Sequence, residues 1–338
     1  MSDQNPVLRP PVGPAHARIL GVGGYRPARA VTNDEIAPRI NSSDEWIRER
    51  SGIVQRRFAD AEETVPHMGA AAAGKALAQA GIAPENVGAV MVATSTHFKQ
   101  IPAVATEIAY KVGAVNAAAF DISAACAGFT HGVALAGDMV RGGSADYVLL
   151  VGAERMSDLI DHDDRSSAFL FGDGAGAAVI GPSPTPGIGT VVWGADGSQR
   201  EVIDQTSSWL DLRGPGVPDR FPALTMQGPT VFRWAVYEMA KAAQQALDAA
   251  GITSDQLAAF IPHQANLRII ETLARTLKVP AGVAIARDVV DSGNTSAASI
   301  PLAMERLLET GQAPSGGLAL TIGFGAGLSY AVQVITLP

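Results

Sequence analysis

Short apolar runs of strand length alternate along this chain with longer segments in which apolar residues recur at helical spacing. In the first half, these patterns predict strands at 17–23, 89–94, 117–122, 147–152 and 177–180, and helices at 64–80, 103–112 and 127–141. Ser42 or Ser43 is placed to cap a short helix that carries Trp46 and Arg50. The order of elements indicates a series of βα units.

The second half repeats this order after the Pro-rich run 182–187. Helices are expected at 231–250, at 267–277 and from about 295 to 308, and strands at 258–262, 283–290, 318–322 and 330–337. Strand 89–94 corresponds to 258–262, and the strand before Cys126 corresponds to the strand before Asn294. Right-handed crossovers then predict mixed, mostly parallel sheets covered by helices, in a duplicated α/β protein of five layers.

This pattern divides the chain into three segments. Residues 1–16 are Pro-rich, lack apolar periodicity and are expected to form a flexible arm. The two halves are expected at 17–181, with Cys126, and at 188–338, with His263 and Asn294. In such sheets, chemistry takes place at strand ends, which is where all three residues fall.

Composition narrows the class of protein. The 338 residues are 47% hydrophobic and carry a formal charge of −8, which argues against nucleic-acid binding, because phosphate neutralisation needs a basic face. One cysteine excludes an intrachain disulfide framework and a thiolate zinc cluster. No apolar run reaches the roughly 20 residues that span a bilayer, and no signal peptide is evident. We expect a cytoplasmic protein without membrane contact.

The single cysteine, Cys126, is the leading candidate for a catalytic residue. It lies at a predicted strand-to-helix turn among very small neighbours, which leave room for a substrate. At a helix N-terminus, unpaired amides and the helix dipole lower the pKa of a thiol. A free amide beside the sulfur could also stabilise an oxyanion. The alternative is a buried structural thiol, since free cysteine is often buried.

Two polar residues follow strands of the second half. His263 directly follows a predicted apolar strand, where a structural histidine is the common alternative to a catalytic one. Asn294 follows Gly293, so it is either part of a turn or an amide donor to a substrate carbonyl. The segment His162-Asp163-Asp164 is more typical of a solvated loop than of a metal site. We therefore expect no metal site.

Other known signatures are incomplete or absent. The glycines at 21–24 and 323–327 do not complete a dinucleotide-binding fingerprint, which argues against a nucleotide-cofactor fold. The Gly-x-Ser-x-Gly motif of serine hydrolases is also missing.

Four motifs together resemble those of β-ketoacyl-acyl carrier protein synthase III, the priming condensing enzymes of the thiolase superfamily, and in detail their actinobacterial members. They are AACAGF at 124–129, FGDGAG at 171–176, HQAN at 263–266 and GNTSAA at 293–298. Elongating synthases carry a second histidine in place of Asn294, and thiolases a second cysteine. Chalcone synthases usually have proline where Ala326 stands. The resemblance runs from about residue 17 to the C-terminus.

The resemblance implies a mechanism in two steps. Cys126 would accept an acyl group from acyl-coenzyme A, with the oxyanion held by the amides of Cys126 and Gly327. His263 and Asn294 would then donate hydrogen bonds to the thioester carbonyl of malonyl-acyl carrier protein and stabilise the enolate formed by decarboxylation. The product would be a 3-ketoacyl-acyl carrier protein. Acyl-coenzyme A is a substrate here, and no cofactor is expected.

The resemblance also implies binding residues. Coenzyme A would contact Trp46, Arg50, Arg165, Gly228 and Asn266. The acidic carrier protein would dock on a local basic patch at Arg268, Arg275 and Lys278. A homodimer is expected.

Substrate choice is left open by two departures from the family pattern. Ile101 stands where acetyl-specific members have phenylalanine, at a position that lines the acyl pocket of the partner subunit. This favours branched or longer acyl groups. Pro229 replaces a residue with a backbone amide, and the loop 205–222 is shortened, both beside the expected coenzyme A tunnel.

Two further functional classes remain open. The same fold could serve a specialised polyketide pathway, as a starter-unit synthase or as an acyl transferase to a hydroxyl or an amine. A non-catalytic carrier-protein-binding partner is the third alternative. The presence of Cys126 argues against it.

Overall fold

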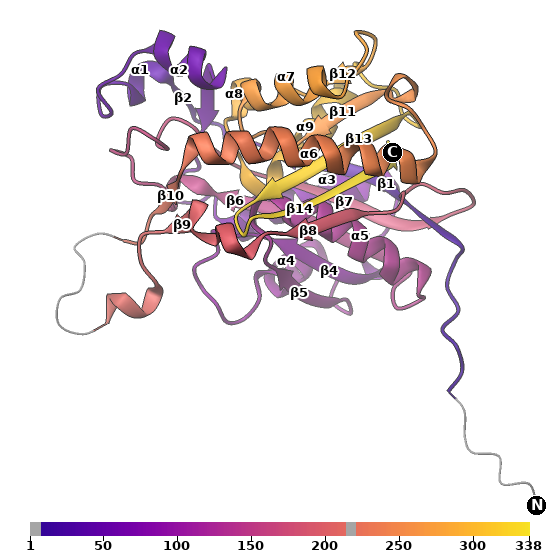
Figure 1. Ribbon diagram of the computed structural model, residues 1–338. Coiled ribbons are helices and arrows are strands. Elements are labelled where there is room, and N and C mark those ends of the chain that lie inside the picture. Colours follow the sequence, from indigo (N-terminus) through magenta and orange to yellow (C-terminus); the bar gives the residue numbers. More distant parts are fainter. Residues whose placement is uncertain (1–7, 214–220) are drawn as a thin grey trace, which may run out of the picture.

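Two five-stranded sheets carry the fold in the computed structural model, which describes residues 8–213 and 221–338 (Figure 1). The first sheet has the order β1 (His16–Tyr25), β7 (Asp173–Ser183), β6 (Tyr147–Arg155), β4 (Val87–Ala93) and β5 (Ala118–Ile122). The second has the order β8 (Val192–Ala195), β14 (Ser329–Thr336), β13 (Leu318–Gly325), β11 (Ala259–Pro262) and β12 (Ala284–Ile285). Strands at matching positions in the two sheets occur in the same sequence order. The duplicated α/β architecture is therefore confirmed.

The strand directions differ from the expectation of mostly parallel sheets. In each sheet the central strand of the parallel part, β4 or β11, runs parallel to both of its neighbours, and the other two pairs are antiparallel. The three residues 326–328 join β13 to β14, and so short a connection permits only an antiparallel pair. The sheets are therefore mixed, as predicted, but only two of the four strand pairs in each sheet are parallel, because apolar runs do not encode strand direction.

Helices form the other three layers. The outer face of the first sheet is covered by α3 (Val65–Ala80) and α4 (Val104–Val112), and that of the second by α6 (Gly228–Ala250) and α7 (Leu267–Thr276). The central layer between the sheets consists of α5 (Gly128–Arg141) and α9 (Ser299–Glu309). In Figure 1 the long α6 crosses over β13 and β14. The expected five-layered αβαβα core is confirmed.

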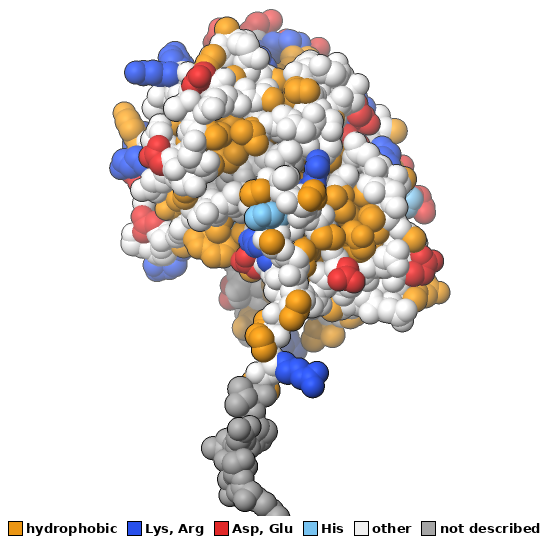
Figure 2. Space-filling view, turned by 90° about the vertical axis from the view of Figure 1, so that its right-hand side faces the viewer, with side chains coloured by type: hydrophobic (Ala, Val, Ile, Leu, Met, Phe, Trp, Pro, Cys, Tyr) orange, Lys and Arg blue, Asp and Glu red, His pale blue; other side chains and the backbone are white. Residues whose placement is uncertain are grey.

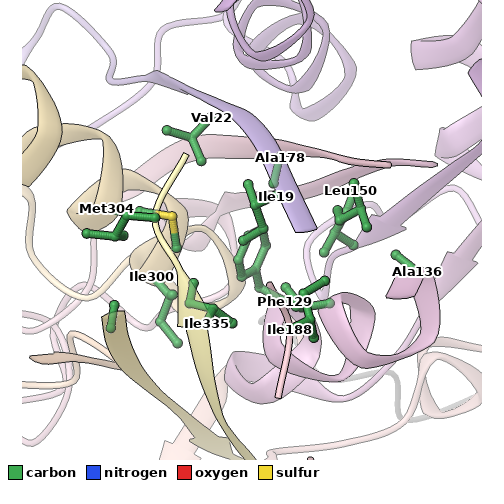
Figure 3. Close-up of a cluster of buried hydrophobic side chains, with 14 of the residues drawn as sticks. Ile19, Val22, Phe129, Ala136, Leu150, Ala178, Ile188, Ile300, Met304 and Ile335 are labelled. Carbon is green, nitrogen blue, oxygen red and sulfur yellow. The ribbon is translucent and has the colours of Figure 1, made fainter. Parts of the chain in front are cut away.

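Residue alternation along the strands explains how the layers pack. On β6, Leu150 points to the central layer, whereas its neighbours Leu149 and Val151 pack against the outer helices. In Figure 3, Phe129 of α5 and Met304 of α9 lie around the same central cluster. A strand buried on both faces has no polar side, so it reads as a continuous apolar run.

Short elements connect these layers. The minor strands form two hairpins, β2 (Ala30–Thr32) with β3 (Gln55–Arg57) and β9 (Ile203–Gln205) with β10 (Leu224–Met226). The short helices are α1 (Asn33–Ile36), α2 (Asp44–Ser51) and α8 (Val289–Ser292). The 3-10 turns are η1 (Pro84–Asn86), η2 (Ala125–Ala127), η3 (Met156–Asp158), η4 (Gly197–Val202), η5 (Trp209–Leu212), η6 (Ser254–Gln256) and η7 (Ser296–Ala298). Ser43 caps α2, as one of the two predicted alternatives, by accepting a hydrogen bond from the Trp46 amide.

The expected strand 283–290 is wrong after its first residues. The chain leaves the sheet beyond Ala286, whose amide makes a last hydrogen bond to Phe260. The Asp288 carboxylate pairs with Arg26 and Arg306, and the Val289 amide donates to the Gln264 side chain. These polar contacts turn the chain into α8, so Asn294 follows a one-turn helix rather than a strand.

Several of the predicted segment boundaries are not tested by the described residues. Residues 8–15 contain no helix or strand. Gly13 packs against the end of α5, and the described residues before it extend away from the body (Figure 2). The rest of the expected arm lies outside the described residues. Part of the loop 205–222, residues 214–220, also lies outside them. The division into 17–181 and 188–338 stays a prediction, and β7 continues to Ser183. Within the described residues, none of the helices is long and apolar enough to cross a membrane.

The central layer gives a first prediction. Leu150→Ala should lower the free energy of unfolding by about 2–5 kcal/mol, because the side chain is fully buried between the sheets. Leu8→Ala is the matched control, since Leu8 is 94% exposed, and its effect should stay within about 0.5 kcal/mol. Urea unfolding followed by circular dichroism measures both. Equal effects would contradict the packing described above.

Candidate active site

Cys126 lies in the turn η2, between the exposed edge strand β5 and the central helix α5. The preceding residue, Ala125, has a left-handed backbone with φ 46°. Gly325 of β13 packs directly against Cys126, because a Cβ there would stand 2.9 Å from the Cys126 nitrogen and 3.3 Å from its sulfur. A side chain at position 325 would therefore block the thiol.

The pKa of the Cys126 thiol differs from the expectation. Although the residue keeps some exposed surface, desolvation raises the pKa of Cys126 to about 12, against the opposing effect of hydrogen bonds from Ser296 and from its own amide. The lowered pKa predicted from a helix N-terminus was wrong, since burial of the sulfur outweighs those amides. The resting thiol is protonated.

A second turn of the same kind faces the first across the two halves. The turn η7 precedes the central helix α9, just as η2 precedes α5. Ser296 has φ 48°, close to the value at Ala125, and η2 contacts η7. The duplicated architecture thus brings two equivalent helix beginnings together at one site.

Asn294 is held by the strand that begins at the FGDGAG motif. Its amide donates to the Leu170 carbonyl at 2.8 Å, and its own carbonyl accepts from the Gly172 amide at 3.1 Å. The side-chain oxygen of Asn294 accepts from the Ser296 amide at 2.9 Å. The Nδ2 group is therefore the donor that Asn294 offers to the adjoining cavity.

The FGDGAG motif owes its position to a buried carboxylate. Asp173 accepts hydrogen bonds from the Ser157 amide and hydroxyl and from the Ala59 amide. Burial raises the pKa of Asp173 to about 6. The motif therefore has a structural role, because it anchors the segment on which Asn294 rests.

His263 stands at the end of β11 and is 2% exposed. Its Nδ1 lies 2.7 Å from the Ser299 hydroxyl, which accepts a hydrogen bond from the Gln264 amide at 3.3 Å. Ser299 can then donate to Nδ1, which leaves the hydrogen of the neutral ring on Nε2. Burial lowers the pKa of His263 to about 3, so the imidazole is neutral.

Three adjoining cavities meet around these residues. The smallest, of about 60 Å³, is lined by Cys126, His263, Asn294 and Ser296. It shares Met226, Val231, Ala265 and Asn294 with a cavity of about 610 Å³, and it shares Ser95, Ala125, Leu159, Ile203, Leu224 and Ala326 with a third of about 510 Å³. The three candidate catalytic side chains therefore lie at a narrow neck between two larger spaces.

The 610 Å³ cavity collects all five of the residues expected to bind coenzyme A, which are Trp46, Arg50, Arg165, Gly228 and Asn266. The guanidinium groups of Arg50 and Arg165 lie 5.3 and 4.9 Å from the centroid of the Trp46 ring. Pro229 lies in the first turn of α6, where the backbone amides have no partner within the helix and a missing donor is tolerated.

The remaining predicted site residues lie at the edges of the three cavities or outside them. Arg268, Arg275 and Lys278 are exposed on or just after α7, and Arg268 also lines the 610 Å³ cavity. Ile101 is 84% exposed and lines none of the three cavities. Gly327 lines the 510 Å³ cavity, whereas Ala326 lines both that cavity and the Cys126 cavity.

Three polar residues at the site were missed from the sequence: Ser296, Ser299 and Glu154. The two serines lie in the segment after Asn294 and were interpreted only as part of a family motif. Glu154 follows the buried apolar run 148–153 within β6 and is itself buried, and a charge directly after such a run was the available signal. Among residues 8–213 and 221–338, no cluster of His, Cys, Asp and Glu could hold a metal ion.

Comparison with known proteins identifies the family. Sequence models of 3-oxoacyl-[acyl-carrier-protein] synthase III match residues 120–197, and those of its C-terminal part match residues 247–337. A β-ketoacyl-[acyl-carrier-protein] synthase III of Streptomyces glaucescens is 62% identical, over 98% of this chain and 99% of the relative. The chain belongs to this family. A mycobacterial synthase III of Mycobacterium avium is 51% identical, over 96% of this chain and 97% of its own length.

Solved structures of synthase III enzymes share the fold. A priming β-ketosynthase from a polyketide biosynthetic pathway superposes with a TM-score of 0.95 at 51% identity, covering 98% of this chain and 99% of that one. The synthase III of Aquifex aeolicus VF5 gives a TM-score of 0.87 at 35% identity, covering 95% and 99%. This chain is therefore a condensing enzyme of the synthase III family with the thiolase fold.

The environment of His263 predicts its protonation behaviour. With a folded pKa of about 3, against about 6.5 in an unfolded chain, His263 should stay neutral between pH 5 and 8. It should also lower stability progressively as the pH falls below 6.5, because only the unfolded chain then binds the proton. Nitrogen-15 NMR of the histidine rings, assigned with His263→Asn, should show one neutral Nε2–H tautomer. A midpoint between pH 5 and 8 would contradict this.

Proposed function

We propose that this synthase III transfers an acyl group from acyl-coenzyme A to Cys126. It then condenses this group with malonyl-acyl carrier protein, with loss of carbon dioxide, to give a 3-ketoacyl-acyl carrier protein and so initiate fatty-acid synthesis. The observation that carries the proposal is the neck at Cys126, His263 and Asn294 between two larger cavities. A thioester entering from one side reaches the sulfur, and an acyl chain can extend into the other.

The roles of the three neck residues follow from their hydrogen-bonding states. Cys126 is the acyl acceptor. His263, neutral with its hydrogen on Nε2, and Asn294, through Nδ2, donate to the thioester carbonyl of the malonyl group. Such donors stabilise the enolate that forms when carbon dioxide leaves, and removing one typically costs about 10²–10³ in rate.

The oxyanion of the acylation step is held by backbone amides. We propose the Cys126 amide together with the turn between β13 and β14, which includes Gly327. Within this turn, Ala326 is the residue that lines the Cys126 cavity itself, and Gly327 lines the cavity beside it. The Ala326 amide is therefore the stronger candidate for the second donor.

The 610 Å³ cavity receives coenzyme A. The Trp46 ring offers a face for the adenine, and Arg50 and Arg165 offer charge for the phosphates, while Gly228 and Asn266 line the path inward. The acidic carrier protein docks on the exposed cations Arg268, Arg275 and Lys278, of which Arg268 also lines the 610 Å³ cavity. No cofactor takes part, and the free thiol suits a reducing, cytoplasmic compartment.

A homodimer would complete the acyl pocket. Among the described residues, the strand β5 is the edge of its sheet and pairs with β4 alone, so it offers backbone groups to a second copy. Ile101 is 84% exposed and does not line the 510 Å³ cavity of its own subunit, although the adjacent Gln100 does, so its side chain is available to that cavity of the partner. Its side chain would set the space for the acyl group.

A second function is favoured by one comparison. The priming β-ketosynthase of a polyketide pathway has the same fold at 51% identity, so the same chemistry could supply the starter unit for a polyketide. The two candidates share the Cys126 acyl-enzyme and differ in the carrier protein that accepts it.

Intact-mass spectrometry tests the function directly. Wild-type enzyme incubated with acyl-coenzyme A should gain the mass of one acyl group, and Cys126→Ala should gain none. Addition of malonyl-acyl carrier protein should then release the 3-ketoacyl product. Asn294→Ala should still form the acyl-enzyme but decarboxylate about 10²–10³-fold more slowly. A wild-type enzyme without an adduct would overturn the proposal.

The side chain at position 101 leads to a prediction about which acyl group the enzyme prefers. The wild type should prefer branched or longer acyl-coenzyme A over acetyl-coenzyme A, and Ile101→Phe should shift that preference toward acetyl, because a larger ring fills the shared pocket. Competition between two acyl donors, scored by the mass of the acyl-enzyme, gives the ratio of kcat/KM values. A strong acetyl preference in the wild type would refute the role of Ile101. Ile101→Val should change the ratio little.

A further inference from the structure

Glu154 is a fully buried carboxylate beneath the active site. It is the penultimate residue of β6, is 0% exposed and accepts hydrogen bonds from the Thr96 hydroxyl at 2.7 Å and the Ser95 amide at 3.0 Å. In the described part of the chain, no Lys, Arg or His forms a salt bridge with it. Burial raises the pKa of Glu154, which makes its carboxylate a stronger base than one in water.

Ser296 connects this carboxylate to the nucleophile. Its hydroxyl donates to Glu154 Oε1 at 2.9 Å, and it lines the same 60 Å³ cavity as Cys126. Hydrogen bonding from Ser296 favours the thiolate and so lowers the pKa of Cys126, whereas the Glu154 charge raises it. While the Ser296 hydrogen is directed to Glu154, the Ser296 oxygen can accept the hydrogen of the thiol, and once that proton has moved Ser296 can donate to the thiolate.

The acylation step needs such an acceptor. The resting thiol is protonated, with a pKa of about 12, and only a thiolate attacks a thioester efficiently. His263 has a pKa of about 3 and is already positioned by Ser299 as a donor on its Nε2 side. A thiolate–imidazolium pair is thus disfavoured in the free enzyme.

We propose that Glu154, acting through the Ser296 hydroxyl, takes the proton of Cys126 during acylation. As the sulfur attacks the thioester carbon, the thiol proton moves to Ser296 and the Ser296 proton moves to Glu154 Oε1. When the bond to the coenzyme A sulfur breaks, the proton returns along the same path to that sulfur. Coenzyme A leaves as a thiol and Glu154 is again a carboxylate, so no further reactant is needed.

This inference rests on the proposed function and divides its two steps between two serines. Ser296 serves the acylation of Cys126, and Ser299 positions His263 for decarboxylation. Both precede or begin the same central helix, α9. Variants of each serine should therefore impair different steps.

The experiment uses Glu154→Gln and Ser296→Ala in the full-length enzyme. Rapid-quench mass spectrometry with acyl-coenzyme A should give acylation rates at least about 10²-fold below wild type, the usual size of a general-base effect. Decarboxylation of malonyl-acyl carrier protein by enzyme acylated beforehand in a long incubation should stay within about threefold of wild type. Alanine suits position 296, since Ala125 adopts the same left-handed φ in the other half.

The pH dependence separates proton transfer from a structural role. The wild-type acylation rate should fall at low pH as Glu154 becomes protonated, and level off above. In Glu154→Gln this fall should be replaced by a rate that rises steadily with pH, because hydroxide or buffer must then remove the proton. Ser299→Ala should give the opposite division, with near-normal acylation and slow decarboxylation.

Two results would overturn the relay. Acylation at the wild-type rate in Glu154→Gln would show that the carboxylate takes no proton. Equal losses in both steps, with an unchanged pH profile, would show that Glu154 only supports the fold. Failure of the proposed function would look different, because the wild type itself would then form no acyl adduct.

Discussion

The site depends on the contact between the two turns that begin the central helices. The turns η2 and η7 come from different halves of the chain, and they meet only because α5 and α9 share one layer between the sheets. A glycine of the first sheet also leaves room for η7: a Cβ on Gly152 of β6 would stand 2.4 Å from the Ala297 carbonyl oxygen. Cys126 and Ser296 are neighbours as a result of that packing, although they are 170 positions apart in the sequence.

Burial of the site then determines the protonation states of its side chains. Burial raises the pKa values of Cys126 and Glu154 and lowers that of His263, and each shift favours the uncharged form of its group. A neutral imidazole donor is suited to an enolate oxygen. A neutral thiol, in contrast, requires help before it can attack. The two steps of the reaction therefore place opposite demands on one small cavity.

The sequence predicted the architecture well because its information lies in local apolar patterns, which give element type and order. Asn294 and His263 were placed at the site from their positions after strands and from the family motifs. The early end of strand 283–290 and the raised pKa of Cys126 depend on contacts between distant residues, such as Asp288 with Arg306. Local spacing carries no such information. The link from Glu154 to Ser296 was missed for the same reason.

The neck of about 60 Å³ has a kinetic consequence. If one path from the 610 Å³ cavity serves both thioesters, the pantetheine arms of coenzyme A and of the carrier protein cannot occupy it together. Each substrate must then find the path emptied by the product of the previous step. The enzyme would follow ping-pong kinetics, and free coenzyme A would compete with malonyl-acyl carrier protein rather than with the acyl group already on the sulfur.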